Sequence, residues 1–250
     1  SIMDRILRLG DIQAYYLAKC AERAYERKGL GLKEKILCRE VPSMDEVISE
    51  ADKWISSQRW PDKSLVGLRR RLEVLEFSGV FSQQTTVPFD SLLETPANFE
   101  LGKLPNNEAQ AMFIEIFLRK LYRHMLKKGK TSKVNLFVLI DEAQRVCIAS
   151  AKEPSFAGTI SAEARKYGVG LITSNQMARD LDKAIIGNAA ITFAFYQKEP
   201  NEAEYIIKLM TGPDNERETA LNRELTKLQK FECICITTKN RDPVKITVKP

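Results

Sequence analysis

The feature that most constrains the fold is a regular alternation of short apolar runs with helical patterns from about residue 97 onward. The clearest run, Val134 to Ile140, is rich in β-branched and aromatic residues and bounded by charged ones, which is typical of a buried strand. Further strands are predicted over 98–101, 169–173, 191–196, 231–237 and 244–248, with helices over 105–128, 161–167, 181–186 and 200–210. Alternating strands and helices predict an α/β domain with a largely parallel sheet flanked by helices.

The first third of the chain has a different pattern, which predicts an all-helical subdomain. Its apolar residues recur at helical spacing in segments that begin near Ile6, Ser43 and Ser64, and Ser43 with Glu46 has the form of a capping box. The expected divisions are an all-helical subdomain at 1–80, a connector at 81–96 and an α/β domain at 97–250.

The composition excludes several classes of protein. With 44% hydrophobic and 29% charged residues, 12 Gly and 10 Pro, the chain is neither collagen-like nor disordered. The longest apolar run, Leu136 to Ile140, is far shorter than the roughly 20 residues of a membrane-spanning helix, so no span is expected. The five cysteines form no CxxC pair, which favours free thiols in a reducing, cytoplasmic compartment.

The net charge of +6 is unevenly distributed. From Arg119 to Lys133 the chain carries seven Lys or Arg residues and no carboxylate. Such a stretch can neutralise DNA phosphates, or it can be the solvated face of a helix. Lys127, Lys128 and Lys130 are the candidates for contact with DNA or with a neighbouring subunit.

Two adjacent acids, Asp141 and Glu142, directly follow the apolar run at 136–140. Ligands of α/β sheets bind at the carboxyl ends of the strands, and two acids placed there are costly to desolvate without a cation. In P-loop nucleotide hydrolases, an acid after such a strand holds Mg²⁺ through water, and a following glutamate polarises the attacking water. The alternative is a strand that ends in solvent with two exposed acids.

Two further candidates flank the predicted strand at 169–173. Gln176 follows it, and an amide there can hydrogen-bond the attacking water or the γ-phosphate. Arg165 precedes it and can reach a phosphate as an arginine finger, in its own or an adjacent subunit. Arg165 can equally be a solvated cation that favours the end of its helix.

No phosphate-binding loop is found in the sequence. The only Gly-Lys-Thr, at Gly129 to Thr131, has His124 where the pattern GxxxxGK[ST] requires its first glycine. It also follows a helix and precedes a strand, the reverse of the required order.

Taken in order, four segments resemble the HerA/FtsK group of RecA-like ring ATPases, especially archaeal HerA-type DNA translocases and their conjugation relatives. These segments are 98–106, 136–144, 164–176 and 181–188. The resemblance covers roughly residues 97 to 250 and implies a RecA-like fold. It also implies that the chain is the back portion of a longer polypeptide, whose earlier part supplies the first strand and the Walker A loop.

The resemblance further assigns roles to single residues. Asp141 matches the Walker B acid, which holds Mg²⁺ through water beside ATP, and Glu142 matches the catalytic glutamate. Gln176 matches the sensor glutamine, and Arg165 the arginine before that strand. The implied parent is a hexameric DNA translocase or helicase with a possible nuclease partner. The chain alone is then expected to be inactive.

Two other functions fit the residues. One is a catalytically inactive ATPase fold that binds DNA or serves assembly. The other is a fragment of a DEAD-type helicase, suggested by the Asp-Glu-Ala-Gln string that begins at Asp141.

Overall fold

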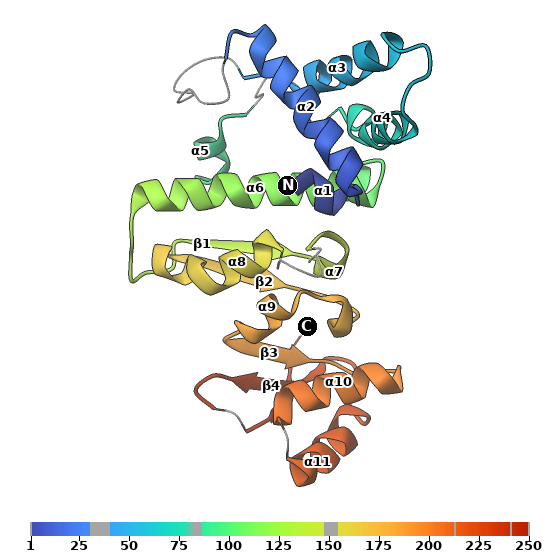
Figure 1. Ribbon diagram of the computed structural model, residues 1–250. Coiled ribbons are helices and arrows are strands. Elements are labelled where there is room, and N and C mark those ends of the chain that lie inside the picture. Colours follow the sequence, from blue (N-terminus) through green and yellow to red (C-terminus); the bar gives the residue numbers. More distant parts are fainter. Residues whose placement is uncertain are drawn as a thin grey trace. The chain divides into compact units, whose positions relative to one another are not determined.

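The computed structural model resolves the chain into helices and strands that fall into two units, one ending at Lys127 and one beginning at Lys128 (Figure 1). The structure describes residues 2–30, 41–79, 81, 87–147, 155–212, 214–240 and 242–249.

The described residues of the first unit form helices joined by turns and irregular segments, with no strand. Its elements are α1 (Ile2–Ile6), α2 (Asp11–Arg27), α3 (Met44–Ser56), α4 (Lys63–Glu76), α5 (Phe89–Leu92), the 3-10 turn η1 (Leu101–Lys103) and α6 (Asn107–Lys128), whose last residue opens the second unit. The predicted capping box at the start of α3 is present, because Ser43 Oγ accepts from the Glu46 N–H at 3.2 Å and Glu46 Oε2 accepts from the Ser43 N–H at 2.7 Å. These paired bonds satisfy two N–H groups that a helix leaves open.

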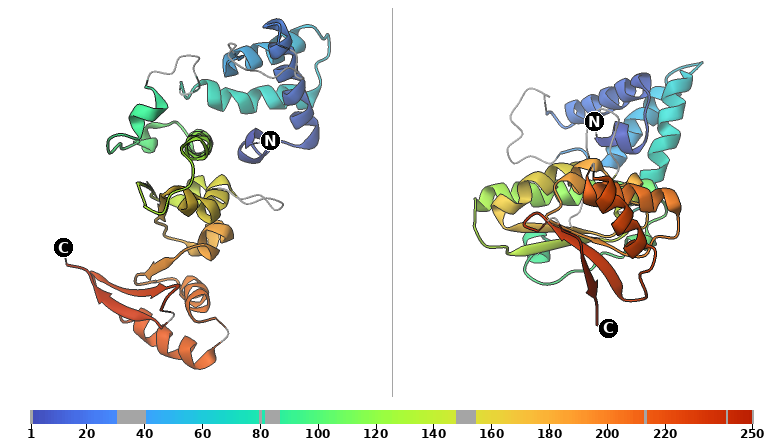
Figure 2. Two further views of the ribbon diagram at one scale, coloured as in Figure 1. Left: turned by 90° about the vertical axis from the view of Figure 1, so that its left-hand side faces the viewer. Right: turned by 90° about the horizontal axis from the view of Figure 1, so that it is seen from below.

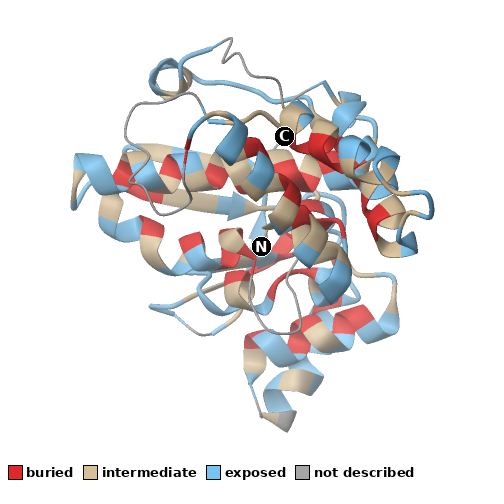
Figure 3. Cartoon of the chain, turned by 45° about the horizontal axis from the view of Figure 1, so that its top comes forward, coloured by how far each residue is buried: buried red, intermediate tan, exposed pale blue. Residues whose placement is uncertain are grey.

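The core of this unit comes from apolar stripes at helical spacing. The four leucines of α4 (65, 68, 72 and 75) are at most 1% exposed, and they pack with buried residues of α2, α3 and α6. The buried positions recur as red bands along the helices in Figure 3. Burial of such side chains contributes about 1.5–3 kcal/mol each.

Two expectations for the first unit are wrong. The apolar pattern that begins at Ile6 is two helices, because the backbone breaks at Arg8 (φ 50°) before α2 begins after Gly10. The strand expected at 98–101 is irregular chain that runs into η1. Phe99 supplied the apolar signal there, and its ring packs on Phe113 and Phe117 of α6, with centroids 5.3 Å away from each.

The second unit contains all the described strands. Its elements are β1 (Leu136–Ile140), α7 (Ala143–Val146), α8 (Phe156–Glu163), the 3-10 turn η2 (Ala164–Tyr167), β2 (Val169–Thr173), the 3-10 turn η3 (Ala178–Asp180), α9 (Lys183–Gly187), β3 (Ile191–Ala194), α10 (Pro200–Thr211), α11 (Asn215–Leu225), β4 (Glu232–Thr237) and β5 (Val244–Thr247).

β1 and β2 form a parallel pair, in which Leu136 lies opposite Val169 and Ile140 opposite Thr173. The chain between them crosses over through α7, α8 and η2, since parallel strands need such a connection. The pair therefore ends at one edge, where the segments that follow Ile140 and Thr173 meet. This parallel sheet flanked by helices confirms the expected α/β class.

The remaining strands form an antiparallel sheet in the order β3-β4-β5. Helices α10 and α11 lie along one face of it, in orange and red in Figure 2. Their shared core includes Ala194 of β3, Ile206 of α10, Leu221 and Leu225 of α11, and Ile234 of β4. The final strand pair was expected from the sequence, whereas α11 was not.

β1 differs from the expected buried strand, because it is buried on one face only. Ile140 is buried, but Phe137 and Leu139 are 64% and 65% exposed. Their side chains share the other face of the strand. In the described part of the second unit no element covers that face, whereas α8 packs against β2.

Candidate functional site

The edge where β1 and β2 end brings the predicted acids and amide together. Backbone bonds continue past both strands: Ser174 N donates to Ile140 O at 3.0 Å, and Ala143 N donates to Ser174 O at 2.9 Å. The segments after β1 and β2 are therefore held side by side. Polar side chains of both segments face the same small region.

Asp141 is exposed, and one of its carboxylate oxygens accepts hydrogen bonds from described residues. Oδ1 accepts from the Ser174 hydroxyl at 2.8 Å and from the Glu142 N–H at 3.0 Å. Oδ2 accepts no hydrogen bond from the residues that the structure describes. The carboxylate is thus oriented by one oxygen and has the other free for a ligand.

Glu142 is held between two amides. Its Oε1 accepts from Gln176 Nε2 at 2.6 Å, and its Oε2 accepts from Gln144 Nε2 at 2.6 Å. Arg145 Nε lies 3.7 Å from the same Oε2. The Glu142 backbone has φ 51° and ψ 43°, the left-handed region, at the turn where β1 gives way to α7. The side chain is therefore fixed in direction from both its backbone and its partners.

Two buried amide oxygens lie on the same segments without a partner. Gln144 Oε1 and Asn175 Oδ1 have no hydrogen-bond partner among the described residues. Buried polar atoms are normally satisfied, so such oxygens indicate donors supplied by water or a ligand. Of the three residues Gln144, Ser174 and Gln176, the sequence pattern assigned a role only to Gln176. The only signal for Ser174 was its place directly after β2.

The donor set at this edge fits Mg²⁺. Carboxylate and hydroxyl oxygens are the hard ligands that Mg²⁺ prefers, and this ion keeps several waters and binds phosphate oxygens instead of requiring a protein cage. The described residues hold no group of three or more His, Cys, Asp and Glu that could bind a metal. Asp141 Oδ2 and the Ser174 hydroxyl are the groups that would hold the ion or its waters.

The structure does not bring Arg165 to this cluster. Arg165 lies in η2, before the start of β2, whereas Gln176 follows its end. β2 rises about 3.3 Å per residue over Val169–Thr173. Roughly 16 Å of strand therefore separates the exposed Arg165 from the carboxylates of Asp141 and Glu142 in the same chain. The structure therefore places Arg165 at the end of β2 away from Asp141 and Glu142.

The candidate lysines are exposed, and one of them lies at the opposite edge of the parallel pair. The segment before β1 is tied to the segment before β2, since Thr131 N donates to Lys166 O at 3.0 Å and Asn135 N donates to Gly168 O at 2.7 Å. Lys130 precedes β1 in this segment, so it lies at the edge where the strands begin. Lys127 and Lys128 are exposed at the end of α6.

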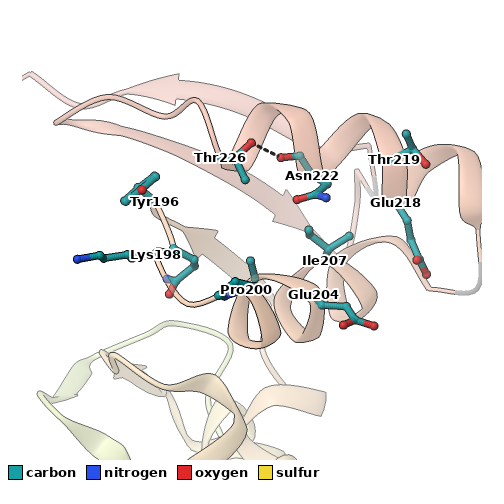
Figure 4. A pocket seen from close by; sticks show the side chains of 11 residues that line it. Tyr196, Lys198, Pro200, Glu204, Ile207, Glu218, Thr219, Asn222 and Thr226 are labelled. Atoms are coloured by element: carbon teal, nitrogen blue, oxygen red, sulfur yellow. Dashed lines mark hydrogen bonds between the residues drawn. The ribbon is translucent and has the colours of Figure 1, made fainter.

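A separate groove of about 570 Å³ lies between α10, α11 and the segment after β3 (Figure 4). Its lining includes Tyr196, Lys198, Glu204, Glu218 and Asn222. None of the residues gathered at the end of β1 and β2 lines this groove: Asp141, Glu142, Gln144, Ser174 and Gln176. Because the lining carries charges of both signs, it indicates no single class of ligand.

Among the helices that the structure describes, none combines the length and the apolar character needed to cross a lipid bilayer.

Comparison with known proteins finds similarity at the level of structure. The sequence matches no protein-family profile and no curated protein. The fold is similar to that of VirB4 of Thermoanaerobacter pseudethanolicus, with a TM-score of 0.65, 16% identity and coverage of 100% of this chain and 67% of that one. It is also similar to the bacterial conjugative coupling protein TrwB, with a TM-score of 0.64, 14% identity and coverage of 99% and 67%.

TrwB in complex with the non-hydrolysable GTP analogue GDPNP gives a TM-score of 0.63 at 14% identity, over the same shares of the two chains. At these identities the likeness shows a shared fold.

Proposed function

We propose that this chain is part of an ATP-driven DNA translocase motor of the FtsK/HerA type. The observation that carries the proposal is the contact of Gln176 with Glu142, beside Asp141, at the common end of two parallel strands. The fold shared with VirB4 and TrwB supports it, as does the nucleotide analogue that TrwB binds.

The chemistry of the site follows from the oxygens and amides already described. Asp141, oriented by Ser174, would hold a Mg²⁺ ion or its waters through Oδ2. Mg²⁺, when bound with ATP, neutralises the charge that develops on the phosphates. Glu142 accepts a hydrogen bond from the attacking water, because each carboxylate oxygen has a second acceptor direction beside its amide partner. Gln176 fixes that carboxylate and donates to the water or the γ-phosphate.

The phosphate-binding loop belongs to a segment outside these 250 residues in this proposal. The lack of a GxxxxGK[ST] pattern within the 250 residues supports it. In this proposal the chain belongs to a hexameric ring, in which Arg165 can reach a phosphate of an adjacent subunit. DNA is the proposed cargo, with Lys127, Lys128 and Lys130 as candidate contacts.

A nucleotide hydrolysis assay on the parent polypeptide tests the proposal. Glu142→Gln is expected to lower kcat for ATP by about 100-fold or more, as for loss of a general base. Glu204→Gln on α10 is the control and leaves kcat unchanged, since Glu204 is exposed and forms its salt bridge with Lys208 of the same helix. The 250-residue chain alone is expected to hydrolyse ATP negligibly.

The outcomes separate the competing functions. Unchanged turnover in Glu142→Gln would contradict the assigned role of Glu142. A parent polypeptide without a phosphate-binding loop, which binds DNA but hydrolyses no ATP, would favour the inactive assembly module. That alternative is kept because the 250 residues contain no phosphate cradle.

A further inference from the structure

A buried carboxylate outside the cluster holds the segment that carries Gln176. Glu202, in the first turn of α10, is 0% exposed. Its Oε1 accepts hydrogen bonds from the backbone N–H groups of Ala178 and of Arg179, the latter at 3.3 Å. These N–H groups open η3, two and three residues after Gln176. A side chain on α10 thus caps the turn that follows the candidate sensor.

The position of Glu202 is itself fixed. Glu199, the N-cap of α10, accepts from the Glu202 N–H at 2.6 Å and from the Asn201 N–H at 3.2 Å. The Arg179 side chain reaches back to both acids, with Nε 3.6 Å from Glu202 Oε2 and a terminal nitrogen 3.9 Å from Glu199 Oε2. Glu202 Oε2 has no hydrogen bond among the described residues, so Arg179 is its only described partner.

Burial of this carboxylate is energetically expensive. A buried carboxylate is unfavourable unless hydrogen bonds and an opposite charge compensate it. Among the described residues, the hydrogen bonds and the ion pair of this carboxylate come from residues 178 and 179, which directly follow the Gln176 segment. The segment from Ser174 to Arg179 is therefore held at both ends by carboxylates, Asp141 and Glu142 at the front and Glu202 at the back.

We propose that Glu202 is a positioning residue for Gln176. By fixing the backbone at Ala178 and Arg179, it sets the reach of the Gln176 amide toward Glu142 and the attacking water. The kinetic part of this inference rests on the proposed function. The structural part, that Glu202 orders the segment, stands without it.

Hydrogen exchange of the 250-residue chain tests the structural part. In Glu202→Ala, exchange of the Ala178 and Arg179 amides is expected to accelerate about tenfold or more, since each loses its acceptor. The amides within β2 of the same variant are expected to keep their exchange rates. In the control variant Glu204→Ala, on the same helix, the amides of Ala178 and Arg179 are also expected to keep theirs. If Glu202→Ala does not fold, Glu202→Asp keeps the charge and withdraws the oxygens by one methylene. Unchanged rates at both amides in a folded variant would overturn the inference.

Kinetics of the parent polypeptide test the link to Gln176. Glu202→Ala is expected to lower kcat about 10- to 100-fold with KM for ATP nearly unchanged, because a misplaced group slows chemistry more than binding. In a Gln176→Ala background, adding Glu202→Ala should lower kcat by at most about a further twofold, since both substitutions remove the same interaction. Glu202→Gln, which keeps an oxygen for both N–H groups, should restore most of kcat.

Different outcomes would contradict the positioning role of Glu202 and the proposed function of the chain. Full additivity of Glu202→Ala and Gln176→Ala would reject the positioning role while leaving the proposed function intact. Normal turnover in Gln176→Ala would reject the assigned role of Gln176, and the exchange result would still decide whether Glu202 orders the segment.

Discussion

Carboxylates in the second unit act largely on backbone N–H groups. Asp182 accepts from Ala184 N at 2.9 Å and from Ser155 N at 2.5 Å, which ties the starts of α9 and α8 together. Glu199 and Glu202 perform the same task at α10 and η3. Such bonds to ionised groups are stronger than neutral ones, so single acids fix the ends of short elements.

A half-buried acid gives a prediction for pH dependence. The N–H of Gln229 (2.8 Å) and the Lys245 ammonium (2.9 Å) hold the pKa of Glu232 below its ordinary value of 4.5. A lowered pKa contributes stability above the unfolded value that is lost as pH falls through the folded one. Glu232→Gln is expected to remove this acid-side loss. Urea midpoints of the two proteins from about pH 6 to pH 3 test this, and parallel curves below pH 4.5 would contradict it.

At the scale of elements, the start of the parallel pair depends on one glycine. Gly168 has φ +75°, and a Cβ there would lie 2.4 Å from Lys133 O and 2.6 Å from Thr131 Cγ2. Gly168→Ala is therefore expected to destabilise the chain by more than about 1 kcal/mol. Gly187→Ala, with open space around its Cβ, is the control and stays within about 0.5 kcal/mol. Equal denaturation midpoints for both variants would refute the steric argument.

Elements with a strong local signal could be predicted from the sequence, and those defined by tertiary contact could not. β2 was predicted at its observed bounds because an apolar run begins directly after Gly168. α11 was missed because its segment is mostly polar, with Leu221 and Leu225 supplying its share of the core. The strand expected around Phe99 fails because none of the described strands pairs with this segment and the Phe99 ring packs on a helix.

The same distinction applies to the candidate site. Asp141, Glu142 and Gln176 each follow an apolar strand, so their common edge follows from parallel pairing alone. Glu202 could not be found in this way. Its partners lie more than 20 residues earlier in the chain, and only the folded second unit brings them together.

At the scale of the whole molecule, the positive charge gives a prediction about DNA. Lys127, Lys128 and Lys130 are exposed. Changing all three to Gln in the parent polypeptide is expected to weaken binding to every DNA sequence alike. The slope of log K against log salt should fall by about 0.9 per lost phosphate contact on duplex DNA.

A matched triple variant controls for the loss of net charge. Lys227, Lys230 and Lys239 are also exposed, and their change to Gln removes the same charge from another part of the chain. If both triple variants bind DNA with the salt slope of the original protein, the basic stretch is only a solvated helix end.

The left-handed backbone at Glu142 lowers stability at the very position for which a catalytic role is proposed. A non-glycine residue with φ 51° carries a conformational cost of roughly 1 kcal/mol, which glycine would remove. Glycine would also remove the carboxylate that Gln144 and Gln176 hold. A screen that rewards thermal tolerance alone would therefore favour the loss of this side chain. An engineer who stabilises this protein has to keep residue 142 unchanged and seek the gain elsewhere.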